Sequence, residues 1–389
     1  MNVESFIDSK KSEMIKFTQS LVKINSIHGN ETAVCKLVGR RLAQYGIKSK
    51  LLGKDAKRLS LMAVIKGENF NKKLMFAGHT DTVPLGDIPK WKYNALSGKI
   101  VADKIYGRGA YDMKSGIAAM VYASIALQKL HDKLNGDVIF VFTADEESGS
   151  HRGIKDVLET GIRPDACIIT EPMNKCELRI GSRGVYRFEI TTIGRSGHTG
   201  ITKSKGINSV TEMAKVLLAL QKMKFRYKPK KKFPKPKITP GTVIKGGVGI
   251  NIYPPECSAL VDCRLSYGQT KKSVKEDIAK TLKKIKTPGN QLKYKIRDIA
   301  FTPPAYTPES HPIAKICLKH MKKIYGRKPD TTISGGATDG NFVYSHGIPH
   351  VIFGPTGDNA HTENEFAHAS TIPQTAKAYV AISLEFLKI

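Results

Sequence analysis

FAGHTDTVP, from Phe76 to Pro84, is the stretch around which the rest of this chain is organised. An apolar run, Leu74 to Ala77, predicts a short buried strand that stops at a glycine. His79 and Asp81 follow, and because they are two residues apart, extended chain turns both side chains to the same side. A carboxylate that accepts the outer N–H of an imidazole fixes the tautomer and leaves the other nitrogen free for a metal. Taken alone, the pair fits a metal site and a self-satisfied His–Asp contact equally well.

Length and composition predict a globular protein of two domains, since the chain has 389 residues, 40% of them hydrophobic and 25% charged. No apolar run approaches the roughly 18 residues of a membrane span, so we expect no membrane contact. Residues 1–17 carry both charge signs and a helical apolar period, which predicts an amphipathic helix instead of a signal peptide and hence a cytoplasmic protein. The six cysteines are scattered, which predicts buried thiols.

The chain is strongly basic, with 63 lysines and arginines against 34 aspartates and glutamates, a net charge of +29. Such a charge attracts nucleic acid, acidic proteins or anionic substrates. Because the lysines are dispersed and lack interleaved aromatic residues, we interpret them as a surface property and do not expect nucleic-acid binding. One denser stretch, Lys222 to Lys237, contains prolines that exclude a continuous helix. It predicts an exposed basic loop or irregular strand edge, and a nucleic-acid-binding arm is the alternative. A basic module that binds nucleic acid or an acidic carrier protein is therefore the alternative function that the charge leaves open.

Apolar strands alternate with helical segments in the first and last parts of the chain. Strands are predicted at Ser60–Ile65, Asp137–Ala144 and Ala166–Thr170, and Ser115–Leu130 predicts a helix that is apolar nearly all round. This alternation predicts an α/β fold, a mostly parallel sheet sandwiched by helices.

Between these parts the pattern changes. Gly184–Gly194 alternates strictly, as a half-exposed antiparallel strand does. It opens a strand–helix–strand–strand–helix–strand order that is typical of a ferredoxin-like α+β domain. We therefore predict a catalytic domain from residues 1–182 and 300–389, interrupted by an inserted domain at 183–299.

Acidic and histidine side chains stand at the ends of the predicted strands of the catalytic domain. The carboxyl ends of strands in an open parallel sheet are where ligands bind, so we expect these side chains to meet at one edge. That many carboxylates would repel one another without a cation, and two His with several Asp and Glu suit zinc, cobalt or manganese. The candidates are His79, Asp81, Asp112, Glu146, Glu147, Glu171 and His361.

Glu146 and Glu147 are informative as a pair because they follow a predicted buried strand. If one holds a metal, the other can face the open coordination position. There it can take a proton from a bound water and return it to a leaving amine. A solvated acidic turn is the alternative.

At this point the chain resembles a known family. GHTDTVP, GRGAYDMKSG, DEESGS, ITEP and AHTENE stand in the order found in the co-catalytic zinc aminoacylases and carboxypeptidases. The resemblance runs from about residue 10 to the C-terminus, and its members include succinyl-diaminopimelate desuccinylase and acetylornithine deacetylase. It implies a dinuclear metallohydrolase that cleaves the amide bond of an N-acyl amino acid. A carboxypeptidase or dipeptidase acting on short peptides at the same site is the alternative.

The resemblance also implies two Zn²⁺ per subunit, with Co²⁺ or Mn²⁺ as alternatives. His79, Asp112 and Glu171 would hold one ion. Asp112, Glu147 and His361 would hold the other, so that Asp112 bridges the two. The peptide after the bridging aspartate is often cis in this family.

Further roles follow from the same resemblance. Asp81 would orient His79, and Glu146 would be the general base that activates the metal-bridged water. The inserted domain would form a homodimer and close over the substrate as a lid, and His198 in RSGHTG would reach the partner's active site to stabilise an oxyanion. A loop histidine without a role is the alternative for His198.

Five positions match substrate-binding sites of the family: Arg183, Asn251, Arg264, Gly336 and Thr338. Arg264 would clamp a substrate carboxylate, since a guanidinium pairs two oxygens at once, and a local ion pair is its alternative. Glu171, where several dipeptidase branches carry Asp, favours an N-acyl amino acid. The chain departs from the family pattern at MKSG and at Ala337–Thr338, which bears on the substrate and not on the reaction.

Overall fold

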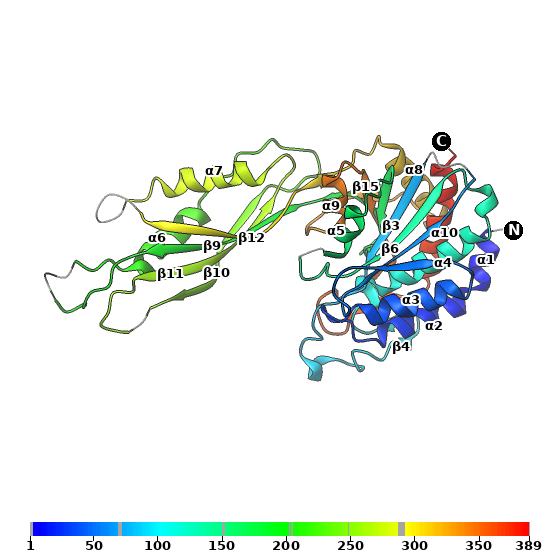
Figure 1. Cartoon of the computed structure of the whole chain (residues 1–389), viewed down its shortest axis with the longest axis horizontal. Helices are drawn as coiled ribbons and strands as arrows, with labels where there is room; N and C mark the ends of the chain where they lie inside the picture. The colour runs from blue at the N-terminus through cyan, green and yellow to red at the C-terminus, as the bar shows by residue number, and fades with distance from the viewer. Residues whose placement is uncertain are drawn as a thin grey trace. The chain divides into compact units, whose positions relative to one another are not determined.

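The computed structural model describes residues 3–68, 72–149, 152–201, 203, 205–247, 249–286 and 292–388. The chain divides into two compact units (Figure 1). The first comprises Met1–Gly181, Tyr306–Thr332 and Thr338–Ile389, and the second comprises Ser182–Ala305 and Ile333–Ala337. The second unit thus extends beyond the predicted end at residue 299 and takes in a short later segment.

The first unit is built on a mixed sheet with the strand order β1-β2-β6-β3-β7-β15-β8-β13, in which β14 also pairs with β8. Four central strands are parallel: β6 (Asp137–Thr143), β3 (Lys73–His79), β7 (Ala166–Ile169) and β15 (His350–Ile352). The predicted sheet is confirmed at this centre. The flanking strands are β1 (Ser49–Leu52), β2 (Ser60–Ile65), β8 (Glu177–Ser182), β13 (Ala305–Tyr306) and β14 (Asp330–Ser334).

Helices cover both faces of this sheet. On one face Phe76 of β3 stacks on Phe140 of β6, with ring centroids 5.2 Å apart, and contacts Tyr379 of α10 at 4.9 Å. On the other face Met75 and Ile139 pack with residues of α5 and α9, as the alternation of strand side chains requires. The helices are α1 (Val3–Ser9), α2 (Lys11–Val22), α3 (Thr32–Ala43), α4 (Ser115–Gln128), α5 (Arg152–Glu159), α8 (Pro312–Tyr325), α9 (Asp339–Ser345) and α10 (Thr371–Phe386).

Three helices bear on the sequence predictions. Ser115 to Leu127 of α4 are all buried, as the uniformly apolar run predicts. The structure has two helices, α1 and α2, where the sequence predicts one near the N-terminus, and the break between them is at Lys10.

The six cysteines are buried free thiols, as expected. In the part of the chain that the structure describes, no helix combines the length and apolarity needed to cross a bilayer.

A small antiparallel sheet of the first unit brings two distant segments together. β4 (Lys99–Val101) pairs with β5 (Lys104–Tyr106), β5 with β17 (Phe366–His368), and β17 with β16 (Gly357–Asp358). The chain leaves β5 for the segment that carries Asp112 and enters β17 from the segment that carries His361. This sheet therefore places two predicted ligands near each other.

The second unit has the predicted ferredoxin-like fold. Its antiparallel sheet has the order β10-β11-β9-β12, with α6 and α7 in the two crossover positions. Phe188, Val261, Met213 and Val274 lie in its core between the sheet and the helices. The elements are β9 (Gly184–Ile193), α6 (Ser209–Gln221), β10 (Lys237–Gly246), β11 (Glu256–Leu265), α7 (Lys271–Leu282) and β12 (Tyr294–Thr302).

The excess positive charge is concentrated in this unit, which corrects the interpretation that it is dispersed. Ser182–Ala305 hold 27 lysines and arginines against 7 aspartates and glutamates, a net charge of +20 out of +29. The stretch Lys222 to Lys237 has no helix or strand until β10 begins, as predicted. Arg226 attaches it to α7, because its backbone N–H donates to Asp277 at 2.9 Å and its guanidinium contacts Asp277.

Candidate metal centre

His79 is the last residue of β3, and its ring is almost completely buried. Its Nδ1 lies 3.0 Å from the main-chain oxygen of Asp81, whereas the Asp81 carboxylate is 3.7 Å away. Donation from Nδ1 to that carbonyl leaves Nε2 free, and Nε2 lies 3.1 Å from Asp112 Oδ1 and 3.7 Å from Glu171 Oε1. The ring is thus oriented as predicted for a ligand, but mainly by the backbone of Asp81 and not by its carboxylate.

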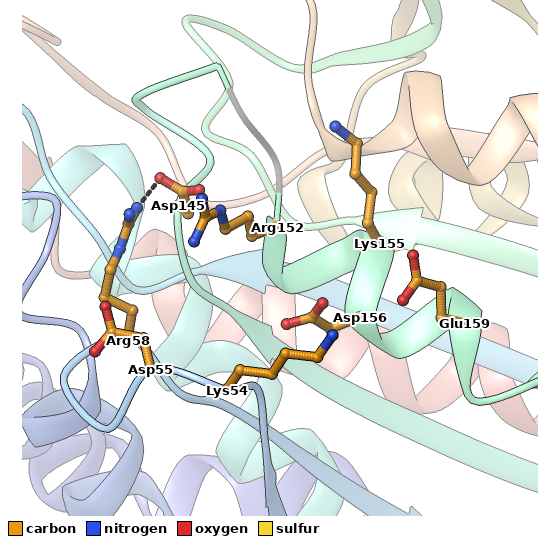
Figure 2. Close-up of a pocket in the computed structure, with 8 residues that line it drawn as sticks. All are labelled: Lys54, Asp55, Arg58, Asp145, Arg152, Lys155, Asp156 and Glu159. Carbon is orange, nitrogen blue, oxygen red and sulfur yellow. Dashed lines mark hydrogen bonds and ion pairs between the residues drawn. The ribbon is translucent and has the colours of Figure 1, made fainter.

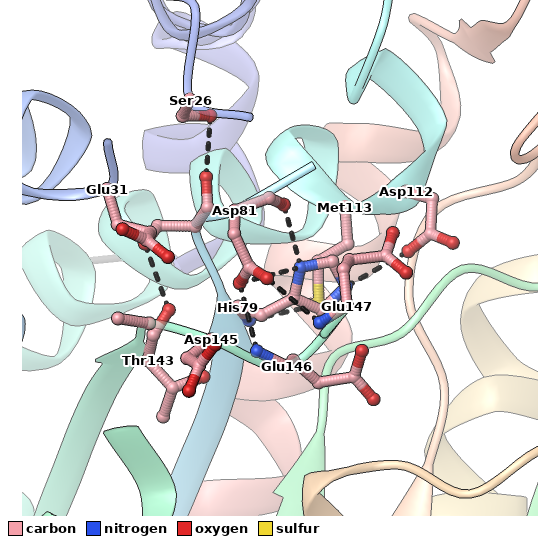
Figure 3. A network of polar contacts seen from close by, with 12 residues as sticks. Ser26, Glu31, His79, Asp81, Asp112, Met113, Thr143, Asp145, Glu146 and Glu147 are labelled. Atoms are coloured by element: carbon pink, nitrogen blue, oxygen red, sulfur yellow. Dashed lines mark hydrogen bonds and ion pairs between the residues drawn. The ribbon is translucent and has the colours of Figure 1, made fainter. Parts of the chain in front are cut away.

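The Asp81 carboxylate has a different task, which sequence reasoning missed. It accepts the backbone N–H of Glu146 at 3.2 Å and that of Glu147 at 2.8 Å, as Figure 3 shows. These bonds hold the turn after β6, where both glutamates stand. No local pattern predicts them, because Asp81 is 65 residues from Glu146 in the sequence.

Asp112 lies between the two histidines. Its Oδ1 is 3.1 Å from Nε2 of His79, and its Oδ2 is 3.2 Å from Nε2 of His361. The same His361 nitrogen lies 3.0 Å from Glu147 Oε1. The Asp112–Met113 peptide is cis, as the resemblance implies. Each carboxylate oxygen of Asp112 therefore faces a different imidazole, which is the arrangement that a bridging ligand needs.

The electrostatics of the cluster favour a cation. Burial, together with the neighbouring carboxylates, raises the pKa of Glu171 to about 8 and that of Glu146 well above its usual range. Burial would also raise the pKa of Asp112, but hydrogen bonds from both histidines hold it below its usual range. Hydrogen bonds to Asp112 and Glu147 raise the pKa of His361 to about 10. Without a cation this many buried carboxylates cannot all stay ionised at low cost.

The donor set fits divalent metals. Ligand atoms of His79, Glu146 and Glu171 lie within 4.8 Å of one another, and so do those of His79, Asp112 and Glu147. The donors are imidazole nitrogen and carboxylate oxygen, which suits Zn²⁺, Co²⁺ or Mn²⁺. Glu146, predicted as the base, is itself one of the three residues of the first group, and Asp112, predicted as a ligand there, is in the second. The structure thus brings the predicted ligands and the predicted base to one place.

A separate cavity of about 480 Å³ lies beside α5 and is lined by charged side chains (Figure 2). Arg58 contacts Asp145 there, and Asp145 directly precedes Glu146. This ion pair is a second contact, beside those of Asp81, that holds the turn carrying Glu146 and Glu147. Sequence reasoning missed it as well.

His198 and Asn251 are neighbours in the second unit. His198 is exposed, its Nδ1 accepts the backbone N–H of Gly200 at 3.0 Å, and its Nε2 lies 3.5 Å from the Asn251 amide nitrogen. The two predicted residues thus share one loop region.

Three of the remaining predicted substrate-binding residues, Arg183, Arg264 and Thr338, make hydrogen bonds within the chain. Arg183 donates to the main-chain oxygen of Arg264 at 3.0 Å. Arg264 Nε donates to Asp262 at 2.7 Å, and this contact is the local ion pair expected from the sequence as the alternative for Arg264. Thr338 caps α9, since its hydroxyl accepts the N–H of Gly340. Gly336 belongs to the second unit, and a Cβ there would meet no atom within 4 Å.

Comparison with known proteins gives a consistent result. Residues 75–385 match the family described as peptidase family M20/M25/M40. The chain is 30% identical over 379 residues to succinyl-diaminopimelate desuccinylase of Pelagibacter ubique, covering 95% of this chain and 97% of the relative. It is 27% identical over 386 residues to the enzyme of that name from Ehrlichia ruminantium, covering 96% and 98%.

Solved structures share the fold. An M20 family metallo-carboxypeptidase of Sulfolobus solfataricus superposes with a TM-score of 0.80 at 20% identity, covering 97% of this chain and all of that one. A Bacillus subtilis protein described as a dinuclear metal-binding peptidase of the M20 family has a TM-score of 0.78 at 16% identity, covering 98% and 99%. These similarities confirm the predicted fold class.

Proposed function

The chain belongs to the peptidase family M20/M25/M40, and from this premise we propose that it removes the acyl group from an N-acyl amino acid, with N-succinyl-diaminopimelate as the leading candidate. The observation that carries the proposal is the position of Asp112, whose two oxygens face His79 and His361. The curated relatives point to the substrate, since the desuccinylases match nearly the full length of this chain.

We propose Zn²⁺ as the metal, with Co²⁺ or Mn²⁺ as alternatives. His79, Asp112 and Glu171 would hold one ion, and Asp112, Glu147 and His361 the other. Bound there, the two cations would lower the pKa of a water and polarise the scissile carbonyl. Asp112 contacts both His79 and His361, and the imidazole nitrogens and carboxylate oxygens of these residues would be metal ligands.

Glu146 would act as the general base and then as the general acid. Its backbone N–H is held by Asp81, and its side chain lies in the same buried cluster as Glu171. From there it would take a proton from the attacking water and return it to the leaving amino group. Asp81 would serve catalysis by holding Glu146 and Glu147 in place.

The second unit would complete the site. We propose a homodimer in which His198 stabilises the developing oxyanion of the partner's substrate, as an exposed imidazole is able to do. Arg264 would bind the substrate carboxylate through its two terminal guanidinium nitrogens. Its hydrogen bond to Asp262 uses Nε and not these two nitrogens. Arg183, Asn251, Gly336 and Thr338 are proposed to line the substrate site. A cytoplasmic location stays a prediction.

The test is a substrate panel on the purified protein loaded with Zn²⁺, Co²⁺ or Mn²⁺. It compares N-succinyl-diaminopimelate, N-acetyl-ornithine, dipeptides and tripeptides. We expect the highest kcat/KM for the succinylated substrate. Hydrolysis of peptides without hydrolysis of N-acyl amino acids would favour a carboxypeptidase or dipeptidase instead. Failure to hydrolyse any of these amides with any of the three metals would refute the proposal.

A further inference from the structure

Arg108 and Glu365 form a buried ion pair outside both proposed ligand sets. Arg108 Nη1 lies 2.7 Å from Glu365 Oε2, and the side chains are 2% and 1% exposed. Arg108 follows β5, and Glu365 directly precedes β17. These strands pair with Tyr106 opposite Phe366, and Gly107 N–H donates to the main-chain oxygen of Glu365 at 2.9 Å. A buried ion pair is weak evidence for stability in itself, so the role of this pair depends on which segments of the chain its two side chains contact.

The Glu365 carboxylate organises the turn that carries Asp112. Its Oε1 accepts the backbone N–H groups of Tyr111 and Asp112, each at 3.0 Å. Its Oε2 accepts that of Gly109, also at 3.0 Å. Gly109 has a φ of 77°, in the left-handed region that favours glycine, which lets the turn close around the carboxylate. Three backbone donors of one turn thus end on a single side chain.

Arg108 connects the same carboxylate to two further segments of the site. Its Nη1 donates to the main-chain oxygen of Thr362 at 3.1 Å, next to His361. Its Nε donates to the main-chain oxygen of Pro84 at 3.1 Å, at the end of the segment that begins with His79. One guanidinium therefore joins the three segments that supply His79, Asp112 and His361.

We propose that Glu365, with Arg108, is a positioning residue that sets Asp112 between the two metal positions. The inference rests on the proposed metal site and adds a residue that touches no metal. A bridging carboxylate needs both oxygens aimed at once, so a shift of its backbone disturbs both ions together. Loss of Glu365 should therefore weaken both metal positions, whereas loss of His361 should affect mainly one.

The test is the affinity of the full-length protein for Co²⁺, measured by competition with a chromogenic chelator, together with the visible absorption spectrum of the bound Co²⁺. Glu365→Gln keeps the shape but replaces an acceptor oxygen by an amide group, so at least one backbone N–H loses its partner. We expect both dissociation constants to rise by about 10- to 100-fold, with a changed spectrum, since residues that orient metal ligands have effects of this size.

Asp137→Asn is the matched control. Asp137 is also a buried carboxylate in an ion pair, with Lys66 at 2.7 Å, but it stands at the start of β6, away from the strand end that precedes Glu146. We expect this variant to keep both dissociation constants and the Co²⁺ spectrum of the wild type, even where its stability falls.

Wild-type constants and spectrum in Glu365→Gln would overturn the inference and leave the proposed function standing. If that variant does not fold, Glu365→Asp and Arg108→Lys take its place, and wild-type affinity for both ions in these would overturn it equally. A wild-type protein that binds no Co²⁺ would overturn the metal site and the inference together.

Discussion

His350 makes the stability of this protein depend on pH in a way that can be worked out from its surroundings. It begins β15 at the centre of the sheet, its side chain is fully buried, and neither ring nitrogen has a hydrogen-bond partner in the described part of the chain. Burial lowers the pKa of His350 to about 4, because the charged imidazolium would lose its hydration. The folded protein thus keeps this ring neutral at a pH where the unfolded chain protonates it.

The sign and size follow from linkage. Above the unfolded pKa of about 6.5 the ring is neutral in both states and has no effect. As pH falls below that value, only the unfolded state binds the proton, so the free energy of unfolding falls by about 1.4 kcal/mol per pH unit. The loss contributed by His350 is about 2 kcal/mol at pH 5 and reaches about 3 kcal/mol near pH 4.

The assay is urea unfolding of the wild type and of His350→Leu at pH 7.5 and at pH 5.0, with a chelator present so that metal release does not contribute. We expect the leucine variant to lose about 2 kcal/mol less than the wild type over this interval. Val351→Ala, a neighbouring buried substitution without a titrating group, should lower stability and keep the wild-type pH dependence. Equal pH dependence in His350→Leu and the wild type would refute the reasoning.

Three further predictions concern the metal centre. Glu146→Gln should keep both metals and lower kcat by a factor of about 10² to 10⁴, the usual range for a lost general base. Elemental analysis beside kinetics checks this, and turnover near the wild-type level would contradict it. His361→Ala should lose one of two metal equivalents, and two retained equivalents would argue against its role as a ligand. Asp81→Asn should cost about 1–3 kcal/mol of stability in urea, because a buried backbone N–H of Glu146 or Glu147 loses its acceptor. Unchanged stability would show that those bonds matter little.

Local patterns were sufficient for most of the fold. The uniformly apolar run of α4 and the strict alternation of β9 are properties of consecutive residues, so the sequence predicts both elements and the two kinds of domain. The helix α9 was missed, because only seven residues follow a glycine-rich segment that favours a turn. Its cap at Thr338 is a local signal, made within three residues of the sequence, whereas its packing beside α5 is a tertiary feature. The N-terminal break at Lys10 likewise carries no local signal such as Gly or Pro.

The sequence by itself determined the family, the donor types and their positions at strand ends, because motifs and apolar periodicity are written in neighbouring residues. Only the tertiary structure decided which atom serves which purpose. Asp81 uses its carbonyl for His79 and its carboxylate for the turn that carries Glu146, and Glu365 holds the backbone of Asp112 from 253 residues away. Bonds of this kind depend on how distant segments are packed, and no short pattern encodes that packing.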